Sequence, residues 1–142
     1  MAEGVGSRAA TRSARRVTPG TRQRFVAATE QLDDGTPVVF VMGEVDLATA
    51  PALEQTLRGV ADDRTGAVIV DLTGCSFLDS RGLGALVATK ARLERSHGRL
   101  ALVLSNRSEL RIFQITPFDE LFEFYPSLGA AVDGNGNGNG HG

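Results

Sequence analysis

Short apolar runs alternate with stretches of helical periodicity along most of this chain. Residues 25–30 (FVAATE) suit a strand, residues 38–42 (VVFVM) are apolar and rich in β-branched side chains, and the turn sequence DDG lies between them at residues 33–35. This pattern predicts two strands joined in a hairpin. Residues 67–72 (AVIVDL) form a nearly continuous apolar run, which is typical of a buried strand. Residues 100–104 predict a further strand, and residues 118–125 an edge strand.

Between these runs the apolar residues recur three and four positions apart, as on one face of a helix. A first helix is expected to start near Thr49, which can cap it, with Pro51 in its first turn. A second helix should begin at Asp79 or Ser80 and end near Gly98, a natural C′ residue.

Two shorter helices follow in the predicted order. Residues 105–108 introduce a third helix that passes through Leu110 and Phe113, and Pro117 should stop it. A last short helix is expected over residues 127–132. Strands and helices that alternate with short loops predict right-handed crossovers and a mostly parallel sheet. The fold class is therefore α/β, a single domain with a mixed sheet and helices mainly on one face.

The two ends of the chain lack this periodicity. Residues 1–21 are rich in Ala, Arg, Ser, Thr and Gly and are expected to form a disordered basic arm. Residues 22–132 should form the domain. Residues 133–142 carry alternating Gly and Asn, which cannot bury a core, and are expected to be a flexible tail.

Composition narrows the class of protein. A chain of 142 residues with 42% hydrophobic residues is long enough for one domain. No apolar run is long enough to span a membrane, and no apolar segment follows the N-terminal arginines as in a secretory signal. Cys75 is the only cysteine, so we expect no internal disulfide and a cytoplasmic location. Cys75 is either a small buried residue, the reading we favour, or a reactive thiol.

The formal net charge of −2 conceals an asymmetry between the arm and the domain. The arm carries four arginines, Arg8, Arg12, Arg15 and Arg16, against the single glutamate Glu3, and Arg22 follows it directly. It lacks interleaved aromatic residues and leads into an acidic domain, so it is interpreted as a solvated leader. We therefore expect no direct nucleic-acid binding and no membrane binding. The acidic domain is compatible with a basic protein partner.

Ser80 stands where the buried strand gives way to the second helix. The first N–H groups of a helix lack internal partners and the helix dipole is positive there, so Ser80 is suited to be an N-cap and a phosphate would be stabilised. On these grounds alone Ser80 is either a plain helix cap or a phosphoacceptor. Gly82 and Gly84 follow it, and because they lack Cβ atoms another backbone could approach this helix end.

Two segments of the chain resemble the markers of one protein family. Residues 77–84 (FLDSRGLG) resemble the phosphorylation-site signature of the anti-sigma factor antagonists, the STAS-domain proteins. Residues 43–51 (GEVDLATAP) resemble that family's acidic loop between a strand and a helix. The two markers have the family's order and a similar separation, and the match extends from about Phe25 to Val132. The resemblance implies the STAS fold and places Ser80 on the family's phosphorylated serine.

The resemblance also implies a function. The unphosphorylated form would bind an anti-sigma factor and free a sigma factor for transcription. That anti-sigma factor would be an ATP-dependent serine kinase that phosphorylates Ser80 and so ends the interaction, and a phosphatase would reset the switch. The ATP and magnesium belong to the kinase, so no cofactor and no metal is expected in this chain. We expect a monomer or a weak dimer.

The resemblance implies a contact face around Ser80. Leu83 and the backbone of Gly82 and Gly84 would form it, with Glu44, Asp46 and Asp79 around it. In the family, acids at the positions of Asp46 and Asp79 help present the serine and contact the kinase. The alternative from local chemistry is that these carboxylates accept backbone N–H bonds.

Arg81 departs from the family, which usually has a second small hydroxyl residue at that position. An arginine beside a phosphoserine could pair with the phosphate and change the preference for a kinase.

Other classes of function find less support. Residues 82–84 are followed by Val87 where a dinucleotide fingerprint needs glycine. Ser80 lacks a Gly-x-Ser-x-Gly elbow and His97 would lie at the opposite end of its helix, so we expect no enzyme. No His/Cys cluster predicts a metal site. One alternative keeps the fold but makes the chain a scaffold or sensor subunit of a stressosome-like or lipid-transport complex, in which Ser80 is never phosphorylated.

Overall fold

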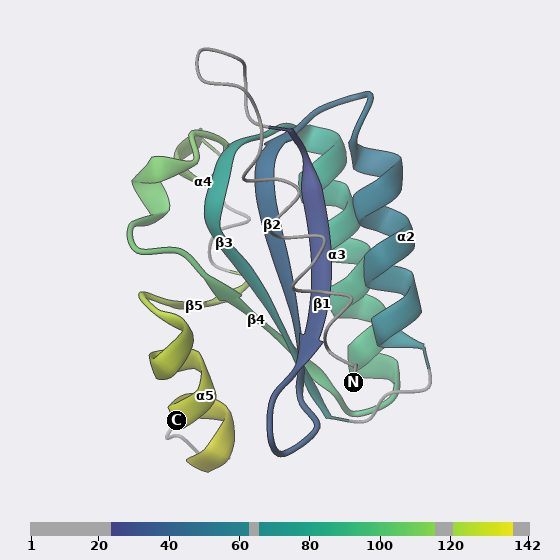
Figure 1. The fold of residues 1–142 in the computed structure, drawn as a ribbon, viewed down its shortest axis with the longest axis vertical. Helices are drawn as coiled ribbons and strands as arrows, with labels where there is room; N and C mark the ends of the chain where they lie inside the picture. Colours follow the sequence, from purple (N-terminus) through teal and green to yellow (C-terminus); the bar gives the residue numbers. More distant parts are fainter. Residues whose placement is uncertain (1–23, 63–65, 116–120, 138–142) are drawn as a thin grey trace.

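The computed structural model describes residues 24–62, 66–115 and 121–137. Five strands form one sheet in the order β1-β2-β3-β4-β5 (Figure 1). β1 runs antiparallel to β2, and the other neighbouring pairs are parallel. The mostly parallel mixed sheet predicted from the sequence is confirmed. The strands are β1 (Val26–Gln31), β2 (Pro37–Val45), β3 (Ala67–Leu78), β4 (Arg99–Val103) and β5 (Glu123–Tyr125).

The two long helices, α2 (Ala50–Ala61) and α3 (Ser80–Arg95), lie side by side on one face of the sheet (Figure 1). They bury the main core between them and β2, β3 and β4. Helix α5 (Leu128–Asn137) packs on the other face, where Ala131 joins a smaller cluster with Val38 and Ile69. The prediction that helices cover mainly one face is therefore confirmed.

The buried strand β3 is longer than the sequence predicts. We expected it to end at Leu72, but it continues to Leu78. Its pairing with β2 shifts register twice, between Phe40 and Met42 and between Gly43 and Glu44, and each shift adds one residue on β3. Such bulges break the inside–outside alternation of a strand, so the extension has no simple hydrophobic pattern. Phe77 points outward and is half-exposed, while Cys75 is buried.

Helix α3 ends one residue earlier than we expected. His97 has a φ of 65° and is the C′ residue, with its N–H donating to Glu94 O at 3.1 Å. The N–H of Gly98 donates to Leu93 O at 2.7 Å, which completes a Schellman motif. Gly98 is therefore at C″. A Cβ at this position would lie 2.6 Å from the carbonyl oxygen of Gly66, so it is close approach that requires the glycine.

The C-terminal elements differ in length from the prediction. The third helix is divided into a 3-10 turn, η1 (Arg107–Glu109), and a short α4 (Ile112–Ile115). Leu110 and Phe113 are buried as expected. Pro117 and the first residues of the predicted edge strand lie outside the described residues, as do the predicted arm at 1–21 and residues 138–142. Helix α5 continues to Asn137, beyond its expected end at Val132.

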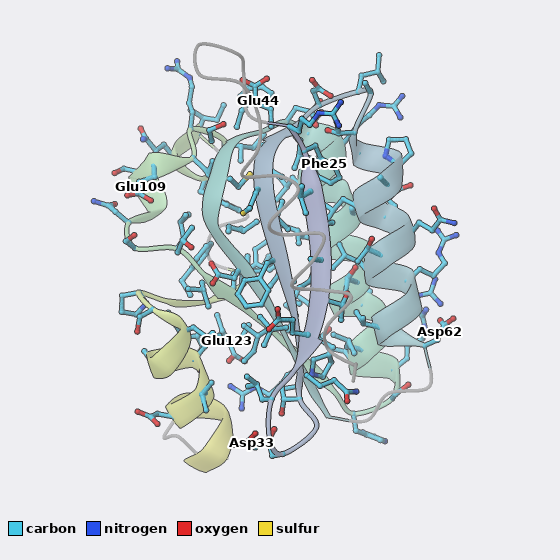
Figure 2. The ribbon with its side chains drawn as sticks, viewed as in Figure 1. Phe25, Asp33, Glu44, Asp62, Glu109 and Glu123 are labelled. Atoms are coloured by element: carbon cyan, nitrogen blue, oxygen red, sulfur yellow. The ribbon has the colours of Figure 1, made fainter. Side chains whose placement is uncertain are left out.

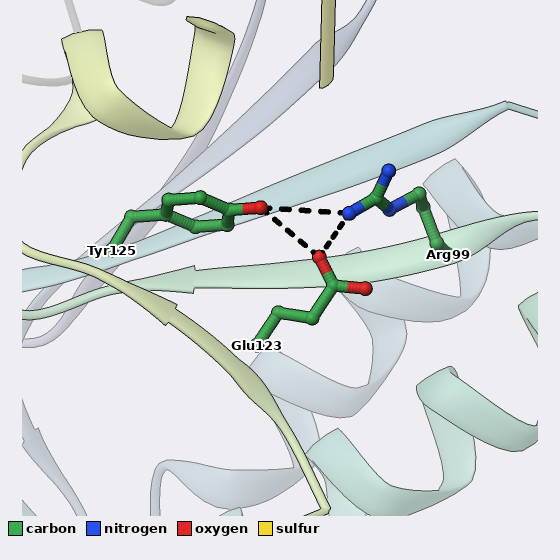
Figure 3. Close-up of polar contacts among 3 residues, drawn as sticks. All are labelled: Arg99, Glu123 and Tyr125. Carbon is green, nitrogen blue, oxygen red and sulfur yellow. Dashed lines mark hydrogen bonds and ion pairs between the residues drawn. The ribbon is translucent and has the colours of Figure 1, made fainter. Parts of the chain in front are cut away.

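The short edge strand β5 is tied to β4 by a polar cluster (Figure 3). Arg99 forms an ion pair and a hydrogen bond with Glu123, and the hydroxyl of Tyr125 donates to Glu123 Oε1 at 3.2 Å. The hydrogen bond with Glu123 raises the pKa of Arg99, and burial raises the pKa of Tyr125. Since a strand of three residues forms few ladder bonds, these side chains help to fix β5 in register.

Burial of Cys75 in β3 makes its reactivity testable. The side chain is 6% exposed, and its S–H donates to Phe77 O at 3.2 Å. Burial raises the pKa of the thiol from 9.0 to about 11. The expectation that Cys75 is a small buried residue is confirmed.

We predict that native Cys75 reacts about a hundredfold more slowly with iodoacetamide at pH 8 than the unfolded chain does, because two pH units separate the pKa values. The native state holds the proton that the unfolded state releases, so the free energy of unfolding should fall by roughly 2 kcal/mol as pH rises from 9 to 11. Mass spectrometry of the alkylated protein measures the rate, with Cys75→Ser as the labelling control. Equal rates in the native and unfolded states would contradict the prediction.

Candidate functional site

Parallel pairing of β2 with β3 brings together the two segments that follow these strands, one with Asp46 and one with Asp79. Val45 pairs with Leu78 as the last registered pair, and the N–H of Asp79 donates to Val45 O at 3.0 Å. Asp46 and Asp79 are the residues that follow this pair on the two strands. The fold therefore brings Asp46 to the Ser80 turn, as we expected from the order of the elements.

Asp79 caps helix α3 where we had considered Ser80 for that role. Its Oδ1 accepts hydrogen bonds from Arg81 N at 2.9 Å and Gly82 N at 3.1 Å. Ser80 is the first helical residue, and its side chain is exposed. Among the described residues its hydroxyl has no hydrogen-bond partner, so the interpretation of Ser80 as an N-cap is wrong. The carboxylate of Asp79 satisfies the amides and leaves the serine hydroxyl available for reaction.

Asp46 organises the loop between β2 and α2 in a similar way. Its Oδ1 accepts from Ala48 N at 3.0 Å and from Thr49 N at 3.1 Å. The hydroxyl of Thr49 donates to Glu44 O at 2.8 Å and accepts from Asp46 N at 2.9 Å. Thr49 is the N-cap residue of α2 by position, but its side chain makes no capping bond to the helix. The loop is thereby folded back on itself, and it leaves Leu47 64% exposed.

Gly82 and Leu83 lie in the core, although the sequence placed them on a contact face. A Cβ at Gly82 would lie 2.4 Å from Leu78 Cδ1 and 2.7 Å from Val45 Cγ1. Leu83 is 5% exposed and belongs to the main core. Gly84 is exposed, with nothing within 4 Å of the place where its Cβ would be. In this conformation Gly82 and Leu83 cannot meet a partner without displacing the core, whereas the other members of the predicted contact set are partly or fully exposed.

A groove of about 400 Å³ opens beside Ser80. One wall is the end of β3 and the start of α3, and the other is formed by η1 and α4. Figure 2 shows Glu109 on the η1 side of β3 and Glu44 at the end of the sheet. The groove is lined by Ser76, Phe77, Leu78, Asp79, Ser80, Glu109, Arg111, Ile112 and Ile115.

Three apolar side chains at this end of the molecule are exposed, which the sequence did not predict. Leu47 follows β2, Phe77 is the last residue but one of β3 with 46% exposure, and Ile115 ends α4 with 64% exposure. Their positions depend on a loop conformation, on a strand bulge and on the break in the third helix. None of these has a periodic pattern that would mark the residues as exposed.

The structure bears on three other kinds of function: catalysis by Ser80 and His97, metal binding and membrane insertion. Ser80 and His97 lie at opposite ends of the 16-residue helix α3, about 24 Å apart along its axis, so they cannot act as nucleophile and base. Among the described residues no three His, Cys, Asp or Glu side chains are grouped to hold a metal ion. None of the described helices combines the length and apolarity needed to cross a membrane.

Comparison with known proteins finds one family whose match includes this site. The model of the STAS domain family matches residues 27–131. Anti-sigma-F factor antagonist RsfB of Mycobacterium tuberculosis is 32% identical over 101 residues, which cover 71% of this chain and 82% of that protein. An anti-sigma-B factor antagonist of Listeria monocytogenes is 35% identical over 86 residues, 60% of this chain and 75% of the relative.

A solved structure shows the same architecture. The crystal structure of an anti-sigma factor antagonist from Mycobacterium paratuberculosis superimposes with a TM-score of 0.70 at 36% identity, covering 79% of this chain and 94% of that one. The family match includes the loop of Asp46, the start of α3 with Asp79 and Ser80, and the residues that line the groove. The chain therefore belongs to the STAS domain family, and the relatives that it matches here are named as anti-sigma factor antagonists.

Proposed function

We propose that this chain is an anti-sigma factor antagonist that binds an anti-sigma factor through the Ser80 end of the molecule. The observation that carries the proposal is the exposed Ser80 hydroxyl, without a hydrogen-bond partner among the described residues, beside the Asp79 cap. Relatives named as anti-sigma factor antagonists support the class of partner. By binding the anti-sigma factor, the chain would release a sigma factor.

The exposed apolar residues provide the contact. Leu47, Phe77 and Ile115 are three of the four large hydrophobic side chains that are exposed among the described residues. The fourth is Leu121, which precedes β5, whereas Leu47 follows β2 and Phe77 and Ile115 line the groove. Apolar side chains gathered at one end of a protein mark an interaction surface. The carboxylates of Glu44, Asp46 and Asp79 at this end suit a partner with a basic surface.

Phosphorylation of Ser80 would oppose this contact and preserve the fold. A phosphate adds between one and two negative charges at neutral pH and three acceptor oxygens. It would stand at the N-terminus of α3, where the helix dipole stabilises negative charge. In an interface the loss of water would strengthen the repulsion between this phosphate and the carboxylates of Asp79 and Asp46, and the bulk of the phosphate would separate the apolar surfaces. Binding is lost while the domain remains folded.

The remaining components of the switch belong to other proteins. We propose that the anti-sigma factor is itself the serine kinase and binds the ATP and magnesium that the reaction needs. A phosphatase would remove the phosphate from Ser80 and so reset the switch. Because bacterial transcription takes place in the cytoplasm, we place the chain there, as a monomer or weak dimer. Neither nucleic acid nor a membrane is needed for this function.

We predict that Ser80→Asp lowers retention of the partner at least tenfold in a pull-down from the native cell extract, whereas Ser80→Ala retains it. On incubation with ATP, intact-mass analysis should show one added phosphate on the wild type and none on Ser80→Ala. Ser127→Asp is the matched control, because Ser127 Oγ accepts from Ala130 N at 3.1 Å and aspartate can keep this bond.

The same experiment distinguishes the switch from its alternative. If the wild type and both Ser80 variants retain the same proteins and no phosphate is added, then Ser80 is not a phosphoacceptor. The chain would then act as a scaffold or sensor subunit that uses the fold without phosphorylation.

We predict that Leu47→Ser and Ile115→Ser each weaken binding of the recovered partner by about tenfold, the loss expected for one buried apolar side chain. Isothermal calorimetry with purified partner measures the affinity. Leu121→Ser removes a side chain of comparable exposure and should leave the affinity unchanged. An equal loss for all three variants would place the contact elsewhere.

A further inference from the structure

We propose that Arg111 holds the phosphate when Ser80 is phosphorylated. This inference rests on the function proposed above and deepens it by assigning a binding residue to the modified serine. Arg111 lies directly before α4, and Ser80 begins α3, yet both residues line the same groove of about 400 Å³. A phosphate on Ser80 that enters the groove would meet the guanidinium group.

The guanidinium of Arg111 has no ion-pair partner in the described part of the chain. It is exposed and forms no ion pair with any carboxylate in the described part of the chain, including Glu109 in the same groove. Lys90, Arg92 and Arg99, by contrast, each pair with a carboxylate. Arg111 can therefore turn toward a new anion without breaking an existing ion pair. Arginine suits this role because its planar group can form two parallel hydrogen bonds to one phosphate.

Arg81 is the competing candidate, since it follows Ser80 in the sequence. Consecutive residues on a helix point in directions about 100° apart and do not face each other. Arg81 is the second residue of α3 and is not among the residues that line the groove. The geometry therefore favours the arginine from the opposite wall over the arginine next in sequence.

Pairing with Arg111 would change what a partner meets. The phosphate and the guanidinium would together fill the space between Phe77 and Ile115, the two exposed apolar residues at the groove. The phosphorylated chain would then present a hydrated ion pair in place of an apolar groove. Phosphorylation would thus remove a docking surface in addition to adding negative charge.

The experiment uses full-length protein with phosphoserine incorporated at position 80 during translation, so that no kinase is required. Phosphorus NMR follows the titration of the phosphate between pH 4 and 8. The second pKa of an unpaired phosphoserine is about 6. Because a neighbouring positive charge favours the dianion, we expect a lower pKa in this protein than in its Arg111→Gln variant, by roughly half a pH unit.

Matched variants isolate the contribution of Arg111. Asp79 and Glu109 also line the groove and oppose the dianion, but they are present in every variant, so differences report the arginines. Arg111→Lys should give an intermediate pKa, because it keeps the charge without the planar group. Arg95→Gln, at the far end of α3, should change nothing.

The proposal is overturned if Arg111→Gln and Arg111→Lys both leave the pKa unchanged, or if Arg81→Gln carries the whole effect. Its failure is distinguishable from failure of the proposed function, since the phosphate is introduced without the kinase and without the partner. A pKa that depends on Arg111 supports the site even if the native kinase does not modify Ser80. A binding switch without that dependence supports the function and rejects Arg111 as the phosphate-binding residue.

Discussion

The parallel pairing of β2 with β3 at their carboxyl ends determines the geometry of the site. The last bond of this pairing runs from Asp79 N to Val45 O, and it fixes the points at which both chains leave the sheet. Helix α3 starts directly on this pair, because Gly82 lies against the side chains of Val45 and Leu78. An added methyl group would push the helix away from the strands and would move Ser80 with it. The position of the serine is therefore set by the backbone bond of Asp79 to Val45 and by the packing of Gly82 against these two side chains.

The acidic residues of the site have a structural task before any partner arrives. Asp79 bonds the free amides at the start of α3, and Asp46 bonds the amides of its own loop. Carboxylates are suited to this task because they accept several N–H groups at once. The same two groups place negative charge beside an exposed hydroxyl. A phosphate on Ser80 would therefore stand beside carboxylates that the two turns need, and burying these like charges together in an interface would cost free energy.

Much of this arrangement could be predicted from the sequence, because it depends on local patterns. The β-branched run before residue 72 and the helical spacing after Ser80 locate a strand-to-helix turn, and the order of elements brings Asp46 near it. The choice of cap was not predictable, because Asp79 and Ser80 are both good caps and only the backbone conformation decides between them. The bulges of β3 likewise depend on contacts between residues far apart in the sequence, whereas the burial of Leu83 follows from the same helical spacing that predicts α3.

The groove illustrates the limit of prediction most clearly. It exists because the chain breaks into η1 and α4 after β4 and returns beside the end of β3. Arg111 and Ser80 are 31 positions apart and share no motif, so no local pattern relates them. An arginine from a separate element that binds the phosphate would have an effect that Arg81, on the same helix as Ser80, cannot have. It would link α4 to α3 only in the phosphorylated state, so modification of one hydroxyl would alter the packing of two elements on the surface that a partner meets.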